Sequence, residues 1–323
     1  MKAIIYQKYG PPKVLKLEEV ATPLVGDDQV LVKVHAASVN PYDWHMMRGT
    51  PYLMRLQSGL VKPKYSGFGN DVAGQVEAVG KNVTEFKPGD EVFGGSRGGL
   101  AEYTCASQEA VVQKPAELTH EQAAAIPMAG ITALQGLRDK GQIQAGQRVL
   151  IHGASGGVGT FAVQIAKSYG VEVTGVCSTR NVEMVRSIGA DHVIDYTQED
   201  FTRSGQRYDL VFDGVGDHTL LELKRALGPK GILVMVGGGK VGRFGFGILG
   251  GLLQVLVLSQ FVSQKLVLMV AKRNRADLVV LTELITAGKI IPVIDRSYPL
   301  SETADAVRYL ETGHARGKVV ISL

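Results

Sequence analysis

A glycine-rich turn between residues 149 and 159 constrains the fold more than any other part of this 323-residue chain. The residues are Val-Leu-Ile-His-Gly-Ala-Ser-Gly-Gly-Val-Gly, so an apolar strand runs directly into glycines that open an amphipathic helix. Such glycines let the backbone approach a pyrophosphate, and the helix N-terminus supplies amide donors and a positive dipole. The turn therefore predicts a dinucleotide-binding strand–turn–helix unit, with Ala154 in place of the first glycine of the usual pattern.

Strands and helices alternate through the middle of the chain, beginning near residue 120. Thr119 and Gln122 predict a capped helix start there. The expected strands cover residues 148–152, 171–176, 192–195, 210–213 and 232–236, and the expected helices end near residues 125, 169, 188 and 287. This β-α-β order predicts a doubly wound parallel (Rossmann) sheet and an α/β fold class.

The first part of the chain is predicted to be rich in short strands. They cover residues 2–7, 14–20, 29–36, 72–79 and 91–93, with proline- and glycine-containing turns between several of them. The C-terminal residues return to a strand-like pattern, so we expect them to rejoin the first domain. The predicted domains are residues 1–122 with 293–323, the β-rich unit, and residues 123–292, the Rossmann unit.

The end of the strand after the glycine turn indicates which dinucleotide binds. An NAD site usually has Asp or Glu about 20 residues after the glycines, where it accepts hydrogen bonds from the ribose. This chain has Ser178, Thr179 and Arg180 instead. A guanidinium pairs with phosphate, and small hydroxyl groups donate to it, so the sequence predicts NADPH. The competing interpretation is that Arg180 only begins the next helix and faces water.

Composition limits the partners and the compartment. The net charge is +4, and the basic residues form only one short cluster, near residues 272–275, so nucleic-acid binding is not expected. Cys105 and Cys177 are the only cysteines, which excludes a four-thiolate zinc site and fits a reducing compartment. The N-terminus turns polar too early for a signal peptide, and we expect a cytoplasmic location.

Residues 244–264 form an uncharged, largely apolar stretch. The stretch is long enough to span a bilayer, but its glycines and the side chains of Gln254 and Gln260 argue against a span. Apolar surface of this extent needs cover on a soluble protein. We therefore expect a homodimer interface, which Leu253→Asp or Leu256→Asp would disrupt, with peripheral membrane contact as the alternative.

Several segments, the glycine turn included, together resemble one family. The others are residues 36–43 (Ala-Ala-Ser-Val-Asn-Pro-Tyr-Asp), 69–74 (Gly-Asn-Asp-Val-Ala-Gly), 86–92 (Phe-Lys-Pro-Gly-Asp-Glu-Val), 130–133 (Gly-Ile-Thr-Ala) and 313–319 (Gly-His-Ala-Arg-Gly-Lys-Val). The chain resembles the zinc-free quinone oxidoreductase branch of the medium-chain dehydrogenase/reductase superfamily. The resemblance implies a GroES-like catalytic domain beside the Rossmann domain. It also implies NADPH-dependent hydride transfer to a small molecule, either a quinone or an activated alkene (an enone or enal).

The resemblance further implies that no metal takes part. Zinc-dependent relatives place Cys near the position of Asn40 and His-Glu where this chain has Asn70 and Asp71. Catalytic zinc normally needs three Cys, His or carboxylate ligands. The histidines of this chain, such as His45 and His152, show no ligand spacing in the sequence, so we expect no metal site.

The predicted site residues come partly from the resemblance and partly from their place at strand ends. By resemblance, the catalytic side chains are Asn40, Asp43 and Tyr52. The predicted cofactor-binding residues are Asn40, Thr132, Ala154, Ser155, Gly156, Gly157, Val158, Ser178, Arg180, Tyr196, Val215, Gly237, Gly238 and Lys318. Structural roles stay open for the catalytic three: Asn40 as a turn residue before proline, Asp43 as a helix cap and Tyr52 as a packing residue.

Two other functions stay open at this point. An enoyl-thioester reductase would use the same hydride chemistry. The second is a non-enzymatic, membrane-associated NADPH-binding protein, in which residues 244–264 would be the functional segment. Oxidation of NADPH with quinones, enones and enoyl-thioesters separates the two enzymes, and membrane partition tests the third hypothesis.

Overall fold

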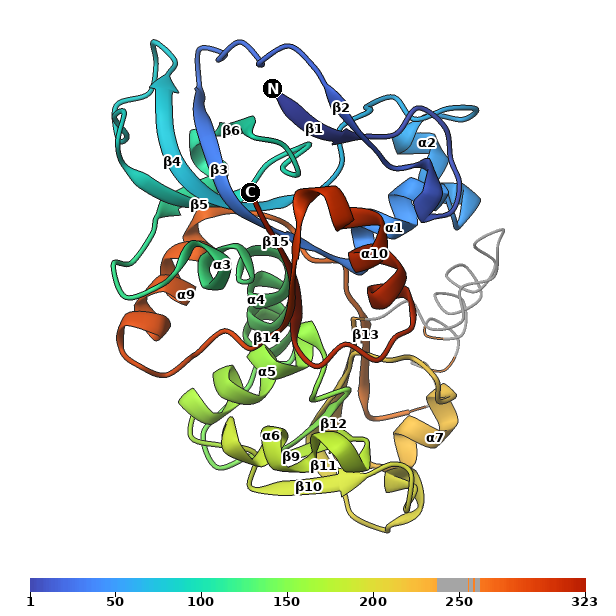
Figure 1. Cartoon of the computed structure of the whole chain (residues 1–323). Helices are drawn as coiled ribbons and strands as arrows, with labels where there is room; N and C mark the ends of the chain where they lie inside the picture. The colour runs from blue at the N-terminus through green and yellow to red at the C-terminus, as the bar shows by residue number, and fades with distance from the viewer. Residues whose placement is uncertain (237–254, 256–257, 259–261) are drawn as a thin grey trace. The chain divides into compact units, whose positions relative to one another are not determined.

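The computed structural model describes residues 1–236, 255, 258 and 262–323, and its contacts divide the chain into two units (Figure 1). Unit 1 comprises Met1–Ile131 and Arg273–Leu323, and unit 2 comprises Thr132–Lys272. This division differs from the predicted domain boundaries, because residues 123–131 and residues 273–292, which include α9 (Arg275–Thr286), belong to unit 1. Leu281 of α9 packs so closely on Gly130 that a Cβ there would lie 2.9 Å from the leucine.

In the described part of unit 2, six parallel strands form one sheet in the order β10-β9-β8-β11-β12-β13. The strands are β8 (Arg148–His152), β9 (Glu172–Cys177), β10 (His192–Asp195), β11 (Tyr208–Asp213), β12 (Leu227–Met235) and β13 (Lys265–Leu268). The helical elements are the π-helix η4 (Gln135–Lys140), α5 (Gly157–Ser168), η5 (Thr179–Asn181), α6 (Val182–Ser187), η6 (Phe201–Arg203) and α7 (Leu220–Arg225). This strand order is the predicted Rossmann arrangement, whose switch point lies between β8 and β11.

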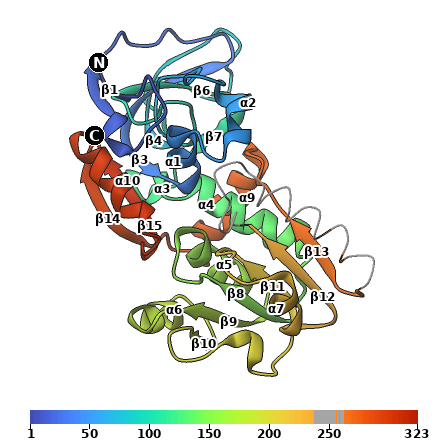
Figure 2. The ribbon, with the colours of Figure 1, turned by 90° about the vertical axis from the view of Figure 1, so that its right-hand side faces the viewer.

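Helices pack on this sheet through buried apolar side chains. α5 packs on β8 and β9, and α7 packs on β12 (Figure 2). Val255, Leu258 and Val262 are half-buried against the cluster that also holds Leu223 of α7. These three belong to the apolar stretch 244–264, most of which lies outside the described residues, as do Gly237 and Gly238. Among the described residues, no helix is long and apolar enough to cross a membrane.

Unit 1 is rich in β-structure, as predicted. In the part that the structure describes, seven strands form a sheet in the order β14-β15-β3-β4-β5-β7, with β6 also paired to β3, and β1 pairs with β2. The strands are β1 (Lys2–Ile5), β2 (Lys16–Glu19), β3 (Gln29–Val39), β4 (Asp71–Val79), β5 (Glu91–Gly95), β6 (Tyr103–Ser107), β7 (Val111–Gln113), β14 (Ile294–Pro299) and β15 (Lys318–Ser322). Besides α9, the helices are α1 (Pro41–Arg48), α2 (Arg55–Ser58), α3 (His120–Ala124), α4 (Pro127–Leu134), which runs into unit 2, and α10 (Thr303–Glu311). Short 3-10 turns are η1 (Pro12–Val14), η2 (Tyr52–Met54), η3 (Gln108–Ala110) and η7 (Leu300–Glu302).

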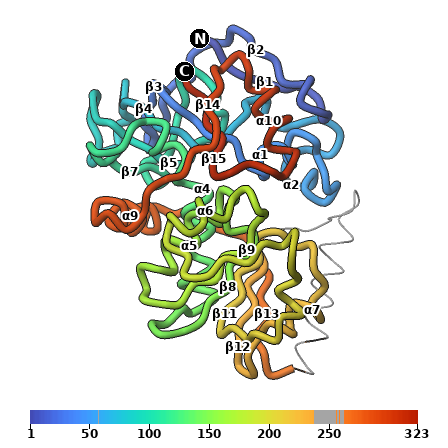
Figure 3. Tube along the Cα trace, turned by 60° about the horizontal axis from the view of Figure 1, so that its bottom comes forward, coloured from blue at the N-terminus to red at the C-terminus, as the bar shows by residue number. Residues whose placement is uncertain are grey.

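The C-terminal strands return to the first part of the chain, and the two termini lie near each other (Figure 3). β15 pairs antiparallel with β3, and β14 pairs parallel with β15. The prediction that the C-terminal residues rejoin the first domain is therefore confirmed. The predicted capping box at Thr119 and Gln122 is present, with both reciprocal hydrogen bonds.

Candidate functional site

The glycine turn of unit 2 connects β8 to α5 at the carboxyl edge of the sheet. Gly153 has a φ of +82°, and a Cβ at Gly159 would lie 2.0 Å from the Gly153 carbonyl oxygen. At Gly156, by contrast, the nearest atom to a Cβ would be 3.4 Å away. Gly156 is the N-cap and has no side chain to cap the first turn of α5, which therefore offers its amide donors to an anion. The turn fits the pyrophosphate of a dinucleotide.

Asn181 links the glycine turn to the end of β9. Its Nδ2 donates to Ser155 Oγ at 3.0 Å and to Ser178 Oγ at 3.4 Å. Among the described residues its buried Oδ1 has no hydrogen-bond partner. A buried acceptor costs free energy until a donor reaches it, and a ribose hydroxyl is such a donor. The sequence analysis did not single out Asn181, because its place at the start of a helix gives no sign of this acceptor.

The loops after β9 and β10 bring a carboxylate close to the predicted phosphate site. Thr179 Oγ1 donates to Asp195 Oδ2 at 2.6 Å, and this hydrogen bond, with others from Thr197, lowers the pKa of Asp195. Parallel pairing sets Asp195 opposite Cys177, the last residue of β9. β9 itself ends without an acid, as predicted, but the neighbouring strand supplies one.

The other predicted cofactor residues of unit 2 differ in exposure. Arg180 and Tyr196 are exposed, Val215 is 40% exposed, Ala154 and Thr132 are buried, and Gly157 and Val158 begin α5. The backbone amide of Val215 donates to Asp213 Oδ1 at 3.0 Å, which holds the loop after β11 against the sheet edge. The three exposed residues, Arg180, Tyr196 and Val215, follow the carboxyl ends of β9, β10 and β11. Ligands of such a sheet bind at these strand ends.

A buried polar network lies at the end of β3 in unit 1. Asn40 Nδ2 donates to Asp71 Oδ2 at 2.9 Å, and Asn40 Oδ1 accepts from Lys318 Nζ at 2.5 Å. Burial lowers the pKa of Lys318, an effect that Asp71, 3.8 Å away, opposes. We predicted Lys318 to bind the cofactor. The structure places its ammonium inside this network, because β15 pairs with β3.

Asp43 lies in the first turn of α1 and is buried. Its Oδ2 accepts from the Asn40 backbone N–H at 2.7 Å, and its Oδ1 accepts from Asn70 Nδ2 at 2.5 Å. Asn70 Oδ1 in turn accepts from the Arg273 guanidinium at 2.7 Å. Burial raises the pKa of Asp43 to about 6, although the hydrogen bond from Asn70 opposes the rise. Asp43 therefore caps α1, which is the structural role that the sequence analysis left open. With this raised pKa, its carboxyl group also keeps a proton up to about pH 6.

A cavity of about 160 Å³ in unit 1 is lined by Asp43, Asn70 and Arg273. Its other walls include the side chains of Tyr6, Tyr42, Met46, Tyr65, Phe68 and Arg97. Burial, chiefly, raises the pKa of Tyr6 to about 12, so its hydroxyl keeps its proton at neutral pH. The cavity can therefore hold a small molecule between aromatic rings and offer hydrogen-bond donors to its oxygen atoms.

Tyr52 is not among the described residues that line this cavity. Its ring packs under the Arg55 guanidinium, 4.5 Å from the ring centroid, which is the packing role left open above. Tyr42, Tyr65 and Arg273 line the cavity, and the sequence analysis missed all three. Tyr42 lies inside a quoted motif and Arg273 in the basic cluster, but neither pattern indicates which side chain faces a cavity.

Known proteins match the chain along its whole length. The family model described as an alcohol dehydrogenase GroES-like domain matches residues 26–116, and the one described as a zinc-binding dehydrogenase matches residues 188–321. The mitochondrial NAD(P)H oxidoreductase RTN4IP1 of Mus musculus is 37% identical over 100% of this chain and 89% of its own length. The chloroplastic NADPH-dependent alkenal/one oxidoreductase of Arabidopsis thaliana is 37% identical over 99% of this chain and 79% of its own.

A solved structure agrees. The quinone oxidoreductase from Coxiella burnetii superposes with a TM-score of 0.87 at 34% identity, covering 100% of this chain and 99% of the other. The chain belongs to the zinc-free quinone oxidoreductase branch of the medium-chain dehydrogenase/reductase superfamily. This oxidoreductase has the predicted Rossmann and GroES-like folds, and its family makes it an enzyme, so the non-enzymatic hypothesis is set aside.

Proposed function

We propose that this oxidoreductase uses NADPH to reduce quinones or activated alkenes, such as enones and enals, without zinc. The observation that carries the proposal is the cavity of unit 1, where a carboxyl group with a pKa of about 6 lies among phenol and guanidinium donors. Hydride addition to an enone places negative charge on the carbonyl oxygen, and hydrogen-bond donors stabilise that charge. The names of the two relatives that are alkenal/one and quinone oxidoreductases support the same substrate class.

NADPH, when bound, supplies the hydride. In this proposal the first amides of α5, at Gly157 and Val158, bind the pyrophosphate, and Asn181 Oδ1 accepts from a ribose hydroxyl. Ser178 and Arg180 bind the 2′-phosphate. Because Asp195 lies close to this position through Thr179, its negative charge opposes the phosphate, and Arg180 decides whether NADPH binds more tightly than NADH.

Asp43 is the proposed proton donor. An enone gains the hydride at its β-carbon and a proton at its α-carbon, and the Asp43 carboxyl group supplies that proton and then recovers one from solvent. Tyr6 keeps its own proton and donates a hydrogen bond to the substrate oxygen. Asn40, whose side-chain amide is engaged with Asp71 and Lys318, positions Asp43 through its backbone N–H.

Zinc takes no part in the proposed reaction. The positions at which zinc-dependent relatives hold metal are the amides Asn40 and Asn70 here, and both side chains are engaged by neighbours. The Lys318 ammonium supplies positive charge beside Asp71, so the network needs no metal ion to balance that carboxylate.

The proposed assembly is a homodimer through residues 244–264, in the cytoplasm. Val255, Leu258 and Val262 are only half-buried within their own unit, which leaves apolar surface for a partner. Peripheral membrane contact through the same stretch is the alternative, and the mitochondrial and chloroplastic names of two relatives leave the compartment open. Light scattering in detergent-free buffer tests the assembly: a dimer mass supports it, a uniform monomer contradicts it, and extraction only with detergent favours the membrane.

Steady-state oxidation of NADPH with quinones, enones and enoyl-thioesters tests the substrate class. Faster turnover of quinones or enones supports the proposal, and faster turnover of enoyl-thioesters replaces it by the alternative reductase.

Asp43→Asn is expected to lower kcat with an enone by about 10²-fold and to abolish the decline of kcat above pH 6. The matched control is Asp27→Asn, a surface carboxyl of the same unit whose side chain is 60% exposed. Unchanged kcat in Asp43→Asn would rule Asp43 out as the donor.

A further inference from the structure

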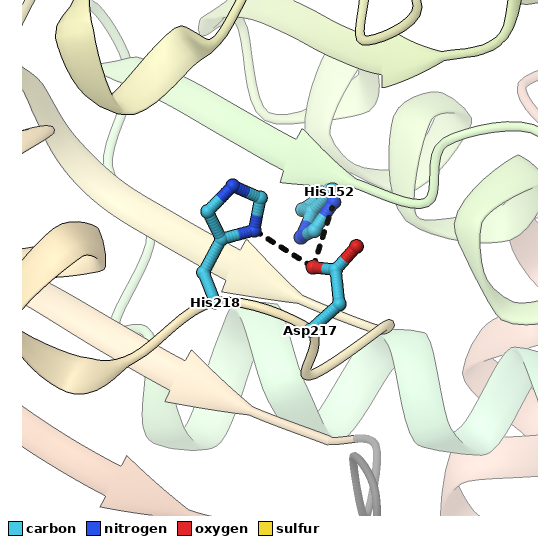
Figure 4. A group of neighbouring side chains, drawn as sticks. All are labelled: His152, Asp217 and His218. Carbon is cyan, nitrogen blue, oxygen red and sulfur yellow. Dashed lines mark hydrogen bonds and ion pairs between the residues drawn. The ribbon is translucent and has the colours of Figure 1, made fainter.

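Three potential metal ligands meet at the carboxyl edge of the sheet in unit 2 (Figure 4). His152 is the last residue of β8, and Asp217 and His218 follow β11, so the cluster lies at the switch point of the sheet. One nitrogen or oxygen of each side chain lies within 4.8 Å of the other two. His152 Nε2 is 3.6 Å from Asp217 Oδ1, and His218 Nδ1 is 2.7 Å from the same oxygen.

Each imidazole faces another carboxylate with its second nitrogen. His152 Nδ1 lies 3.0 Å from Asp213 Oδ1, and His218 Nε2 lies 3.8 Å from Asp200 Oδ1. Asp213 Oδ1 also accepts the backbone amides after β11, so in the contact with His152 the proton sits on the imidazole. Metal-binding histidines almost always direct their second N–H to a carboxylate or carbonyl. His152 makes such a hydrogen bond to Asp213, whereas His218 Nε2 is too far from Asp200 for one.

With Nδ1 engaged by Asp213, the neutral form of His152 presents the lone pair of its Nε2 to the Asp217 carboxylate. Two acceptors then oppose each other beside an imidazole that is 3% exposed, and a cation between them removes the repulsion. Tetrahedral coordination with bonds of about 2.1 Å needs ligand atoms roughly 3.4 Å apart. The observed separations of 3.6 and 2.7 Å lie on either side of that value. The shorter one is a hydrogen bond between His218 and Asp217, which a bound ion would replace.

We propose that His152, Asp217 and His218 bind one divalent transition-metal ion of the zinc type. Imidazole ligands favour Zn²⁺, Co²⁺ or Ni²⁺ over Mg²⁺ and Ca²⁺, which prefer oxygen ligands alone. The side chains of Asp217 and His218 are 53% and 22% exposed, so an ion can enter and water can fill the fourth position.

This metal site is distinct from the position at Asn40 and Asn70, and it does not depend on the proposed reaction. Because His152 directly precedes Gly153, a bound ion ties the glycine turn to the loop after β11 and stabilises unit 2. The sequence analysis expected no metal site, since ligands on two separate strands show no spacing pattern along the chain.

Cobalt(II) is the probe that tests the site, because four-coordinate Co²⁺ absorbs visible light. The full-length chain without an affinity tag is stripped with EDTA and titrated. We expect one equivalent of Co²⁺ per chain, with the visible absorption of a four-coordinate ion that disappears when Zn²⁺ is added. A thiolate-to-cobalt charge-transfer band would place the ion on Cys105 or Cys177 and overturn the assignment, as would no uptake of Co²⁺.

His218→Ala and Asp217→Asn each alter a ligand that is not fully buried, and they are expected to weaken Co²⁺ and Zn²⁺ binding at least tenfold. Zn²⁺ should raise the melting temperature of the unmodified chain and leave that of His218→Ala unchanged. The matched control is His192→Ala, another histidine of unit 2 that faces a carboxylate, Glu172, at 2.8 Å; it should bind metal like the unmodified chain. Equal affinity of His218→Ala and the unmodified chain, with both folded by circular dichroism, would refute the site.

Discussion

In unit 1 the polar side chains of the candidate site are buried and bind one another, whereas several polar groups at the sheet edge of unit 2 are exposed. Asn40 and Lys318 are both 3% exposed and joined by a hydrogen bond. Arg180 is exposed, and the amides of the first turn of α5 have no capping side chain from Gly156. A buried charge that loses its partner costs folding free energy, but a surface group that loses its ligand costs only affinity. Substitutions in unit 1 should therefore act first on stability, and those at the edge of unit 2 on binding.

Lys318→Met should have the largest effect. The substitution leaves the Asp71 carboxylate buried without its cation, and breaking a buried pair in this way typically costs about 3–5 kcal/mol of unfolding free energy. Urea unfolding followed by circular dichroism measures it. The control is Lys81→Met, since Lys81 pairs with Asp27 at 2.9 Å on the surface of the same unit, where about 0–1 kcal/mol is expected. Similar losses of unfolding free energy in the two variants would contradict the expected difference between the buried and the surface ion pair.

Arg180→Ala should act on cofactor affinity and leave stability nearly unchanged. Loss of a charge-assisted contact with the 2′-phosphate costs about 1.5–3 kcal/mol, which weakens NADPH binding roughly tenfold or more. NADH lacks this phosphate, so its affinity should change little. Calorimetric titration of both cofactors gives the comparison. If the unmodified chain binds NADPH and NADH equally, the phosphate site is wrong.

The Asp43 carboxyl should make the stability of unit 1 depend on pH. Its folded-state pKa of about 6 lies above its ordinary value of 3.8, so the folded chain takes up this proton first as pH falls. The carboxyl group therefore stabilises fully below about pH 4, and its contribution is lost as pH rises through 6. Relative to Asp43→Asn, the unmodified chain should lose on the order of 2 kcal/mol between pH 4 and 7. A constant difference across that range would show that the pKa of Asp43 is not raised.

Removal of metal ions should have the smallest effect on turnover. EDTA is expected to leave kcat with a quinone or enone unchanged, since Asn40 and Asn70 offer amides where relatives hold zinc. Elemental analysis and assay of the same sample provide the check. Stoichiometric zinc whose removal abolishes activity would overturn the zinc-free proposal. A fall in melting temperature alone would instead report the His152 cluster.

Local sequence patterns determined much of this fold. The strand–turn–helix from residue 148 to 168, the capping box at Thr119 and the strand that begins at residue 29 were all predicted. Each depends on residues a few positions apart, whose spacing alone sets which face is buried and which backbone donors are capped. The glycine turn was predictable for the same reason, because its close contacts are made within one strand–helix unit.

The tertiary structure decided which distant side chains meet. Lys318 reaches Asn40 only because β15 pairs with β3, and Thr179 meets Asp195 only because β9 and β10 run in parallel register. The His152 cluster likewise joins the ends of two strands. Strand pairing and burial set these contacts, and the same burial raises the pKa of Asp43. Neither the pairing nor the burial can be read from the spacing of residues along one segment. The side-chain contacts of the site and the raised pKa of Asp43 therefore depend on the tertiary structure.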